Sequence, residues 1–208
     1  AYLMARLALP CEQRLAFLDP YLAAGTREDI LLEFVRTLNQ AGRMEKALDV
    51  LSGHAFTPCE GGEHAIAEQY MYAHHALGRR ALAQKNPALA LAHFQAAQKL
   101  PENLGSGLWD ECLLAPHQFF EAECLDALGR REEANRLREA IVGLWIDGFS
   151  DMYLPELRCY QALCWARMGQ AGRGEMMLRE HIALYEQARK HRDAGWFQTT
   201  PFFVTFME

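Results

Sequence analysis

The sequence predicts an all-α protein, an α-solenoid in which short helical hairpins stack one after another. A six-residue phrase returns at a nearly constant interval, and strand-like alternation of apolar and polar residues is almost absent before the last segment. The copies start at residues 42, 85, 129 and 169, so the steps are 43, 44 and 40 residues. They read GRMEKA at Gly42–Ala47, KNPALA at Lys85–Ala90, GRREEA at Gly129–Ala134 and GQAGRG at Gly169–Gly174. A step of this size indicates stacked supersecondary units.

The repeated phrase has the chemistry of a corner between two helices. Apolar residues with helical spacing precede Gly42, from Ile30 to Leu38, and others follow it, from Ala47 to Leu51. Glycine ends a helix well because it enters the left-handed conformation without a Cβ clash. The second copy lacks this glycine, but Asn86 can cap the next helix and Pro87 suits its first turn. The alternative is a chance Gly-Arg turn, and four copies in register argue against it.

The remaining elements follow in order along a single predicted domain, residues 1–208. Residues 1–25 give one or two short helices, broken at Asp19-Pro20, and Thr26–Asp29 resembles a capping box. Residues 26–190 form four hairpins, and residues 191–208 form a non-helical aromatic tail, expected to fold back on the last helices or to cover a groove. The helix pairs are predicted at 27–41 and 43–52, 64–84 and 87–100, 116–128 and 131–146, and 155–168 and 170–190.

Aligned on the corners, the hairpins resemble the tetratricopeptide repeat (TPR), a helix–turn–helix unit of about 34 residues. The small residue of the first helix falls on Val35, Gly78, Ala122 and Ala162, and the bulky residue three places later on Leu38, Ala81, Leu125 and Trp165. The large residue of the second helix falls on Leu51, Phe94, Arg138 and Leu178, and the small residue at the helix crossing on Ala47, Ala90, Ala134 and Gly174. Arg138 and Gly174 depart from the pattern. The resemblance implies a right-handed superhelix, and long loops at Gly53–Gly62 and Pro101–Pro116 account for the longer step.

The loops and the tail carry a second resemblance. Phe56–Glu63, Leu100–Gly105 and Gly195–Glu208 look like segments of a group of long bacterial proteins. Those proteins join an uncharacterised N-terminal domain, with some similarity to sugar-mutarotase β-domains, to a C-terminal array of repeats. The resemblance implies that this chain is the repeat tail of such a protein. Because the sequence opens with Ala and not with Met, we expect either a piece of a larger protein or a trimmed chain. It implies no catalytic residues.

Composition excludes several classes of function. The net charge is -6 with a pI of about 5.8, and the basic residues are scattered, so a nucleic-acid-binding stripe is not predicted. No apolar stretch of membrane-spanning length and no signal peptide is visible. The six cysteines form no CxxC pair, so we expect reduced thiols and a cytoplasmic location.

Three places are candidate binding sites. The first is the acidic loop Glu60-Gly61-Gly62-Glu63, suited to a hydroxyl-rich ligand, a cation or a partner's arginine; alternatively it is a turn whose Glu63 starts the next helix. The second is the loop at Glu102–Gly105, where Asn103 could instead bond its own backbone. Both loops leave second helices, so they are expected on one edge of the array. Trp109, in the long loop, is a further candidate.

The third candidate is the side of the first helices that faces the ligand in such repeats. It is suited to an extended or helical peptide, or it is an ordinary solvated helix face. Projecting the repeat places these residues on it: Arg36, Asn39, Tyr72, His75, Arg79, Phe119, Glu123 and Asp126.

Metal and catalytic motifs are missing from the sequence. The eight histidines include no pair spaced to hold a metal from one helix, and no GxSxG, P-loop or GxGxxG motif occurs, so neither cofactor nor metal is predicted. The first hypothesis is a non-enzymatic scaffold that binds a partner protein or the N-terminal domain of the same polypeptide, with homodimerisation through terminal helices as an option. The second is an accessory domain whose loops complete a carbohydrate-active site in an adjacent domain through Glu60, Glu63 or Asn103.

Overall fold

The computed structural model describes residues 9–22, 27–57, 64–105, 107, 111–144 and 156–190. Within these ranges every regular element is an α-helix or a 3₁₀-helix, which confirms the all-α prediction. The chain divides into two compact units, Ala1–Trp109 and Asp110–Glu208, and each is described by itself. The single domain and the superhelix spanning it therefore stay predictions. The predicted tail, residues 191–208, lies outside the described residues.

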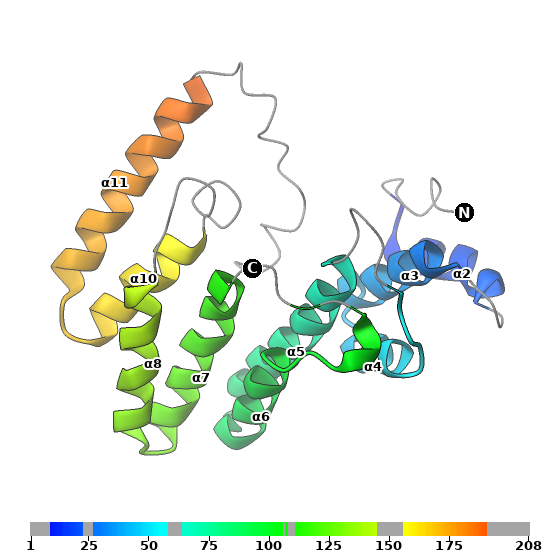
Figure 1. The fold of residues 1–208 in the computed structure, drawn as a ribbon, viewed down its shortest axis with the longest axis horizontal. Helices are drawn as coiled ribbons and strands as arrows, with labels where there is room; N and C mark the ends of the chain where they lie inside the picture. The colour runs from blue at the N-terminus through cyan, green and yellow to red at the C-terminus, as the bar shows by residue number, and fades with distance from the viewer. Residues whose placement is uncertain are drawn as a thin grey trace. The chain divides into compact units, whose positions relative to one another are not determined.

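The first unit contains two complete hairpins behind a short N-terminal helix. The elements are α2 (Cys11–Leu18), η1 (Asp19–Tyr21), α3 (Glu28–Gln40), α4 (Met44–Ser52), α5 (Ala65–Ala83), α6 (Pro87–Ala97) and η2 (Glu102–Leu104). Helix α3 packs against α2 and α4, and α5 packs against both α3 and α4 before pairing with α6 (Figure 1). The first helix of one hairpin thus rests on both helices of the preceding one, which is the stacking expected of TPR-like repeats.

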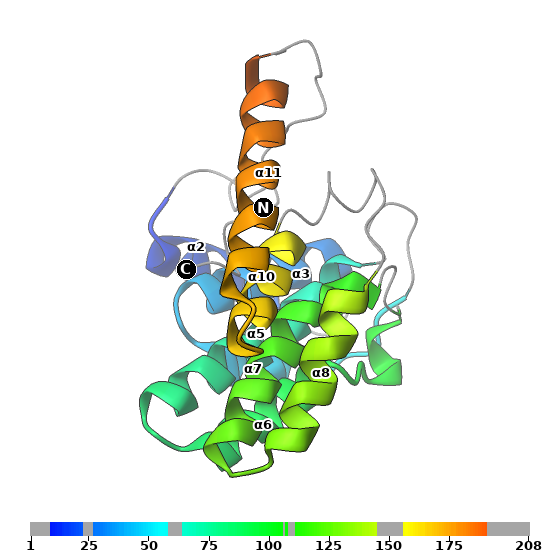
Figure 2. The same ribbon diagram turned by 90° about the vertical axis from the view of Figure 1, so that its left-hand side faces the viewer.

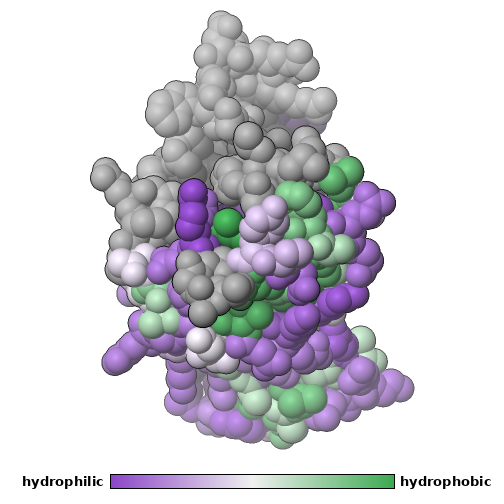
Figure 3. Space-filling view, turned by 90° about the vertical axis from the view of Figure 1, so that its right-hand side faces the viewer, coloured by the Kyte–Doolittle hydropathy of each residue, from purple (hydrophilic) through white to green (hydrophobic). Residues whose placement is uncertain are grey.

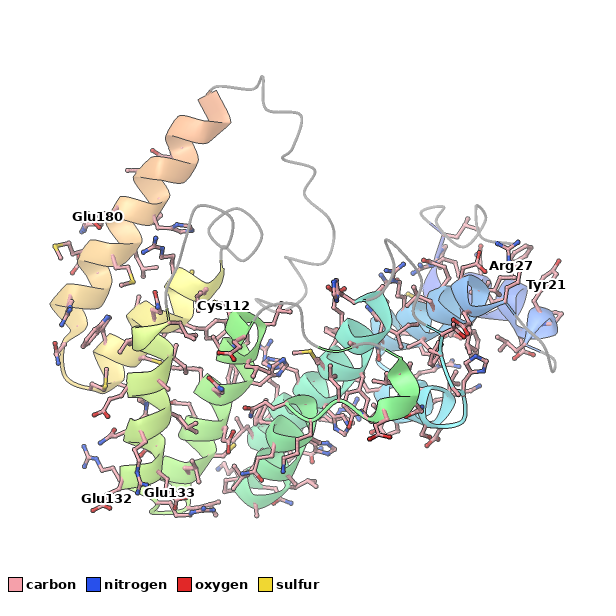
Figure 4. The ribbon with its side chains drawn as sticks, viewed as in Figure 1. Tyr21, Arg27, Cys112, Glu132, Glu133 and Glu180 are labelled. Atoms are coloured by element: carbon pink, nitrogen blue, oxygen red, sulfur yellow. The ribbon has the colours of Figure 1, made fainter. Side chains whose placement is uncertain are left out.

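The second unit repeats this arrangement. Its elements are η3 (Glu111–Leu114), α7 (Ala115–Ala127), α8 (Arg131–Gly143), α10 (Glu156–Arg167) and α11 (Ala171–Lys190). Helix α10 packs against both α7 and α8 and pairs with α11 (Figure 2). Glu132 and Glu133 lie in the first turn of α8, beside the α7–α8 corner, where negative charge is favoured by the helix dipole (Figure 4).

The predicted helix ends lie within three residues of the observed ones, and several coincide with them. Helix α6 ends at Ala97 rather than at residue 100, because Leu100 precedes Pro101 and a residue before proline disfavours helical geometry. The N-cap of α3 is Arg27, with no side-chain capping bond, and Thr26 lies outside the described residues. Asn86 caps α6 as predicted, since its side chain accepts a hydrogen bond from the Leu89 backbone N–H at 3.1 Å.

All four predicted corners have the same backbone geometry. The residue at each corner is left-handed, with φ of 74° at Gly42, 58° at Lys85, 78° at Gly129 and 81° at Gly169. Each corner also has the hydrogen bond of a Schellman motif from the following N–H back to the carbonyl five residues earlier: Arg43 to Leu38, Asn86 to Ala81, Arg130 to Leu125 and Gln170 to Trp165. Lys85 therefore does what glycine does at the other three corners, at a steric cost.

The small residues predicted at the helix crossings are buried, and at Gly174 two backbones lie in close contact. Ala47, Ala90 and Ala134 are fully buried. A Cβ added to Gly174 would lie 2.5 Å from the Ala162 carbonyl oxygen, so only glycine fits there. The departure of Gly174 from alanine thus marks a closer crossing of α10 and α11, not a weaker repeat.

Among the described residues, no helix has the length and apolar character needed to cross a membrane.

Candidate functional site

Polar side chains of α3 and α5 meet on the predicted first-helix face of the first unit. Arg36 forms an ion pair with Glu33 at 2.5 Å, and its side chain is 30% exposed whereas that of Glu33 is 6% exposed. Asn39 donates to the backbone carbonyl and to the side-chain oxygen of Gln69, at 3.1 and 3.0 Å. Because Asn39 is itself buried, it links the two helices and does not offer its amide to a ligand.

Glu68 is the unusual group of this face. Burial raises its pKa from 4.5 to about 7, and Arg36 offsets only part of this rise. The carboxyl is therefore close to the midpoint of its titration at neutral pH. Glu33 pairs with Arg36, and Arg36 also acts electrostatically on Glu68, so two carboxyl groups share one arginine on this face.

The other predicted residues of α5 divide into surface and core. Tyr72 and Arg79 are partly exposed. His75 is 2% exposed and packs edge-on against Phe94, with ring centroids 5.5 Å apart. In this structure His75 belongs to the α5–α6 packing and does not reach the surface.

Figure 3, viewed from the side where α2 and α3 lie, shows a mainly hydrophilic surface broken by hydrophobic patches.

Two histidines that no sequence motif joined lie together on the α5–α6 hairpin. The Nδ1 atoms of His74 and His93 are 3.1 Å apart. The pKa of His74 is lowered to about 4, first by burial and then by His93, and burial is also the main reason that the pKa of His93 is lowered. Both rings are thus neutral at pH 7, and one Nδ1 donates its proton to the other.

In the second unit, the predicted residue Glu123 is part of a charge cluster. Its carboxylate accepts hydrogen bonds from Arg138 of α8 at 2.9 Å and from Arg167 of α10 at 2.9 to 3.1 Å. Arg138 also bonds Asp126 and is only 2% exposed. A buried arginine therefore occupies the position where other repeats place leucine or phenylalanine, and its charge is neutralised by two carboxylates of α7. Phe119, predicted on the same face, is buried against Phe120 and Tyr160.

Asn103 fastens two loops of the first unit to each other. Its side-chain N–H groups donate to the Leu51 and His54 backbone carbonyls at 2.8 and 2.7 Å. The backbone carbonyl of Asn103 accepts a hydrogen bond from the Phe56 backbone N–H at 2.7 Å. The segments 54–57 and 101–105 thus lie side by side, as expected of loops on one edge. Both amide hydrogens of Asn103 are used in these bonds, which leaves only its Oδ1 for a ligand. Glu60, Gly61, Gly62, Glu63 and Trp109 lie outside the described residues.

In the part of the chain that the structure describes, no group of three or more His, Cys, Asp and Glu side chains is arranged to hold a metal ion. The five described cysteines are free thiols, and burial raises the pKa of Cys124 and of Cys164 to about 12, so neither is a thiolate at neutral pH.

No protein-family model matches the chain. It is similar to two solved structures of a protein described as a putative kinesin light chain of Podosopora anserina with nearly identical TPR-like repeats. To a crystal structure of a point variant of that protein the identity is 16%, over 86% of this chain and 85% of that chain, with a TM-score of 0.45. To a second crystal structure the identity is 18%, over 88% and 86%, with a TM-score of 0.40. The TPR-like character of this chain follows from its own hairpin packing, its left-handed corners and its buried small residues.

Proposed function

We propose that this chain is a non-enzymatic protein-interaction module whose α3–α5 face binds a basic segment of a partner protein. The observation that supports this most is Glu68, a carboxyl near the midpoint of its titration beside a partly exposed arginine. A lysine or arginine brought to this face would favour the ionised carboxylate, and the carboxylate would in turn favour the cation. Tyr72, farther along α5, would extend the contact.

Proton release provides the test. If a partner's cation pairs with Glu68, the pKa of this carboxyl falls, and at pH 7 up to about half a proton is released per complex. Isothermal titration calorimetry in buffers of different ionisation enthalpy measures this number directly. We expect the release to disappear in Glu68→Gln, while Lys99→Ala, an exposed site beyond α6, leaves it unchanged. Binding of the partner with no proton release, or with the same release in Glu68→Gln, would contradict the proposed role of the face.

The partner we propose is the N-terminal domain of a longer bacterial polypeptide of which this chain is the repeat tail. The support is the resemblance of the loops and of the C-terminal segment to such proteins. The experiment uses the full-length protein. Cross-linking and limited proteolysis measure how tightly the N-terminal domain docks on the repeat tail. Glu68→Gln and Tyr72→Ala should loosen the docking, and Lys99→Ala should not. If all three behave alike, the N-terminal domain does not use this face.

A second candidate is an accessory role at a carbohydrate-active site of an adjacent domain. The pairing of segments 54–57 and 101–105 by Asn103 supports it, because it brings the flanks of two long loops to one edge. Substituting Glu60 and Glu63 in the full-length protein separates the two functions. Loss of sugar turnover with docking intact favours the accessory role, and loss of docking alone favours the interaction module.

A further inference from the structure

The Nδ1 atoms of His74 and His93 are spaced like two ligands of one metal ion. The two Nδ1 atoms, one from α5 and one from α6, are 3.1 Å apart. Two nitrogen atoms bound to one tetrahedral zinc ion at about 2.0–2.1 Å are separated by about 3.3 Å. The hairpin therefore holds both nitrogens almost at the distance that a shared metal requires, so that binding needs the two rings to turn toward the ion but needs no change in their separation.

The pair is also accessible and in the right protonation state. Both side chains are partly exposed, so an ion and its water ligands can approach from solvent. Metal ions bind neutral imidazole, and protons compete for the same nitrogen. Because burial lowers the pKa of His74 to about 4, protons do not compete for that ring at neutral pH.

We propose that His74 and His93 bind a divalent transition-metal ion, Zn²⁺, Cu²⁺ or Ni²⁺, through their Nδ1 atoms, with water completing the coordination shell. The ion replaces the hydrogen bond between the rings: the Nδ1 proton of the donor ring is transferred through solvent to its own Nε2, and no net proton is lost. The neighbouring groups do not block this. The Tyr70 ring meets His74 edge-on, with ring centroids 4.6 Å apart. Glu45 and Arg80 act electrostatically on His93 with opposite signs and are paired with each other at 2.7 Å, so the charge of Arg80 is offset by Glu45.

Such an ion would link the two helices of one hairpin. Its ligands lie 19 residues apart in the sequence and on opposite sides of the Lys85 corner. In the unfolded chain they are not held together, so the ion favours the folded state and makes thermal stability dependent on metal concentration. The site is independent of the α3–α5 face and of whether that face binds a partner.

The test uses the tag-free chain with ZnCl₂, CuCl₂ or NiCl₂ as the probe. Calorimetry and thermal unfolding should show one site that raises the Tm, with affinity at least about tenfold lower in His74→Gln and in His93→Gln. His181→Gln, which removes a half-buried histidine of α11, is the matched control and should bind as the wild type does. Equal affinity in all four proteins, or no binding, would overturn the proposal.

A second measurement does not depend on the variants folding. Imidazole ¹⁵N spectra of the wild-type chain report each ring nitrogen separately, including its tautomer. We expect added Zn²⁺ to shift the Nδ1 signals of both His74 and His93 together, with the proton of each ring on Nε2. Signals that stay in place while zinc binds would assign the metal to other side chains, such as cysteines, and would end the proposal.

Discussion

Lys85 is the one non-glycine residue with positive φ among the described residues, and its replacement by glycine should stabilise the protein. Its φ of 58° lies in the left-handed region, where a Cβ approaches the following carbonyl oxygen at a cost of roughly 1–2 kcal/mol. Glycine avoids this clash but loses more backbone entropy on folding, by roughly 0.5–1 kcal/mol. The difference predicts a gain of about 0.5–1 kcal/mol for Lys85→Gly, because the lysine side chain is exposed and the backbone bonds of the corner are kept.

Thermal and urea unfolding measure this gain. For a chain of this size, about 1 kcal/mol raises the Tm by ~2–4 °C. Lys85→Ala is the matched control: it removes the same side chain but retains a Cβ, so its stability should stay near that of the wild type. Gly129→Ala is the reverse experiment, since the added Cβ meets nothing within 4 Å and only the positive φ is penalised. If Lys85→Gly and Lys85→Ala have equal stabilities, backbone strain at the corner is not the cause and the reasoning is refuted.

Substitutions at four other positions test the packing and the charges. Gly174→Ala places a Cβ 2.5 Å from the Ala162 carbonyl oxygen, so thermal unfolding should show a loss of about 1–3 kcal/mol in the free energy of unfolding. An unchanged Tm would mean that the two helices can move apart at this crossing without cost. Arg138→Ala strips two carboxylates of a buried partner and should cost about 3 kcal/mol in urea, more than Arg138→Leu, which keeps the apolar packing. Asn103→Ala leaves two backbone carbonyls without their donor, so we expect a loss of about 1–3 kcal/mol and faster proteolysis at 54–57, and equal proteolysis rates would count against it. The pKa of Glu68 is higher in the folded state, about 7, than its ordinary 4.5, so its contribution to stability is full below pH 4.5 and is lost as pH rises through 7. In Glu68→Gln this loss should be missing, and identical pH profiles would contradict it.

The fold was predictable because its signals are local. A corner requires a left-handed residue, and the register of the repeat assigned Lys85 to that position even though it is not glycine. The crossings require small residues, and alanine or glycine stands at each one. The helix ends were less predictable, since the end of α6 depends on the proline that follows it.

The site was harder to predict because it depends on rotation about each helix axis. A shift of one residue turns a side chain by about 100°, which separates buried His75 from half-exposed His74. The contact of Gly78 with Phe94 sets the register of the α5–α6 hairpin. Extending this register along the two helices places His74 opposite His93, so the repeat alignment held a signal for this pair. The elevated pKa of Glu68 had no sequence signal, because it arises from the burial of this side chain in the folded protein.

The way α5 rests on both α3 and α4, and α10 on both α7 and α8, has a consequence for how this chain can be shortened or divided. A cut between α4 and α5, or between α8 and α10, exposes the apolar surfaces of both hairpins at once. Each half then lacks the helices that it packs against. The smallest fragment whose apolar interface stays shielded from water is therefore a pair of hairpins. Deletions or duplications that preserve solubility should accordingly come in steps of two hairpins and not of one.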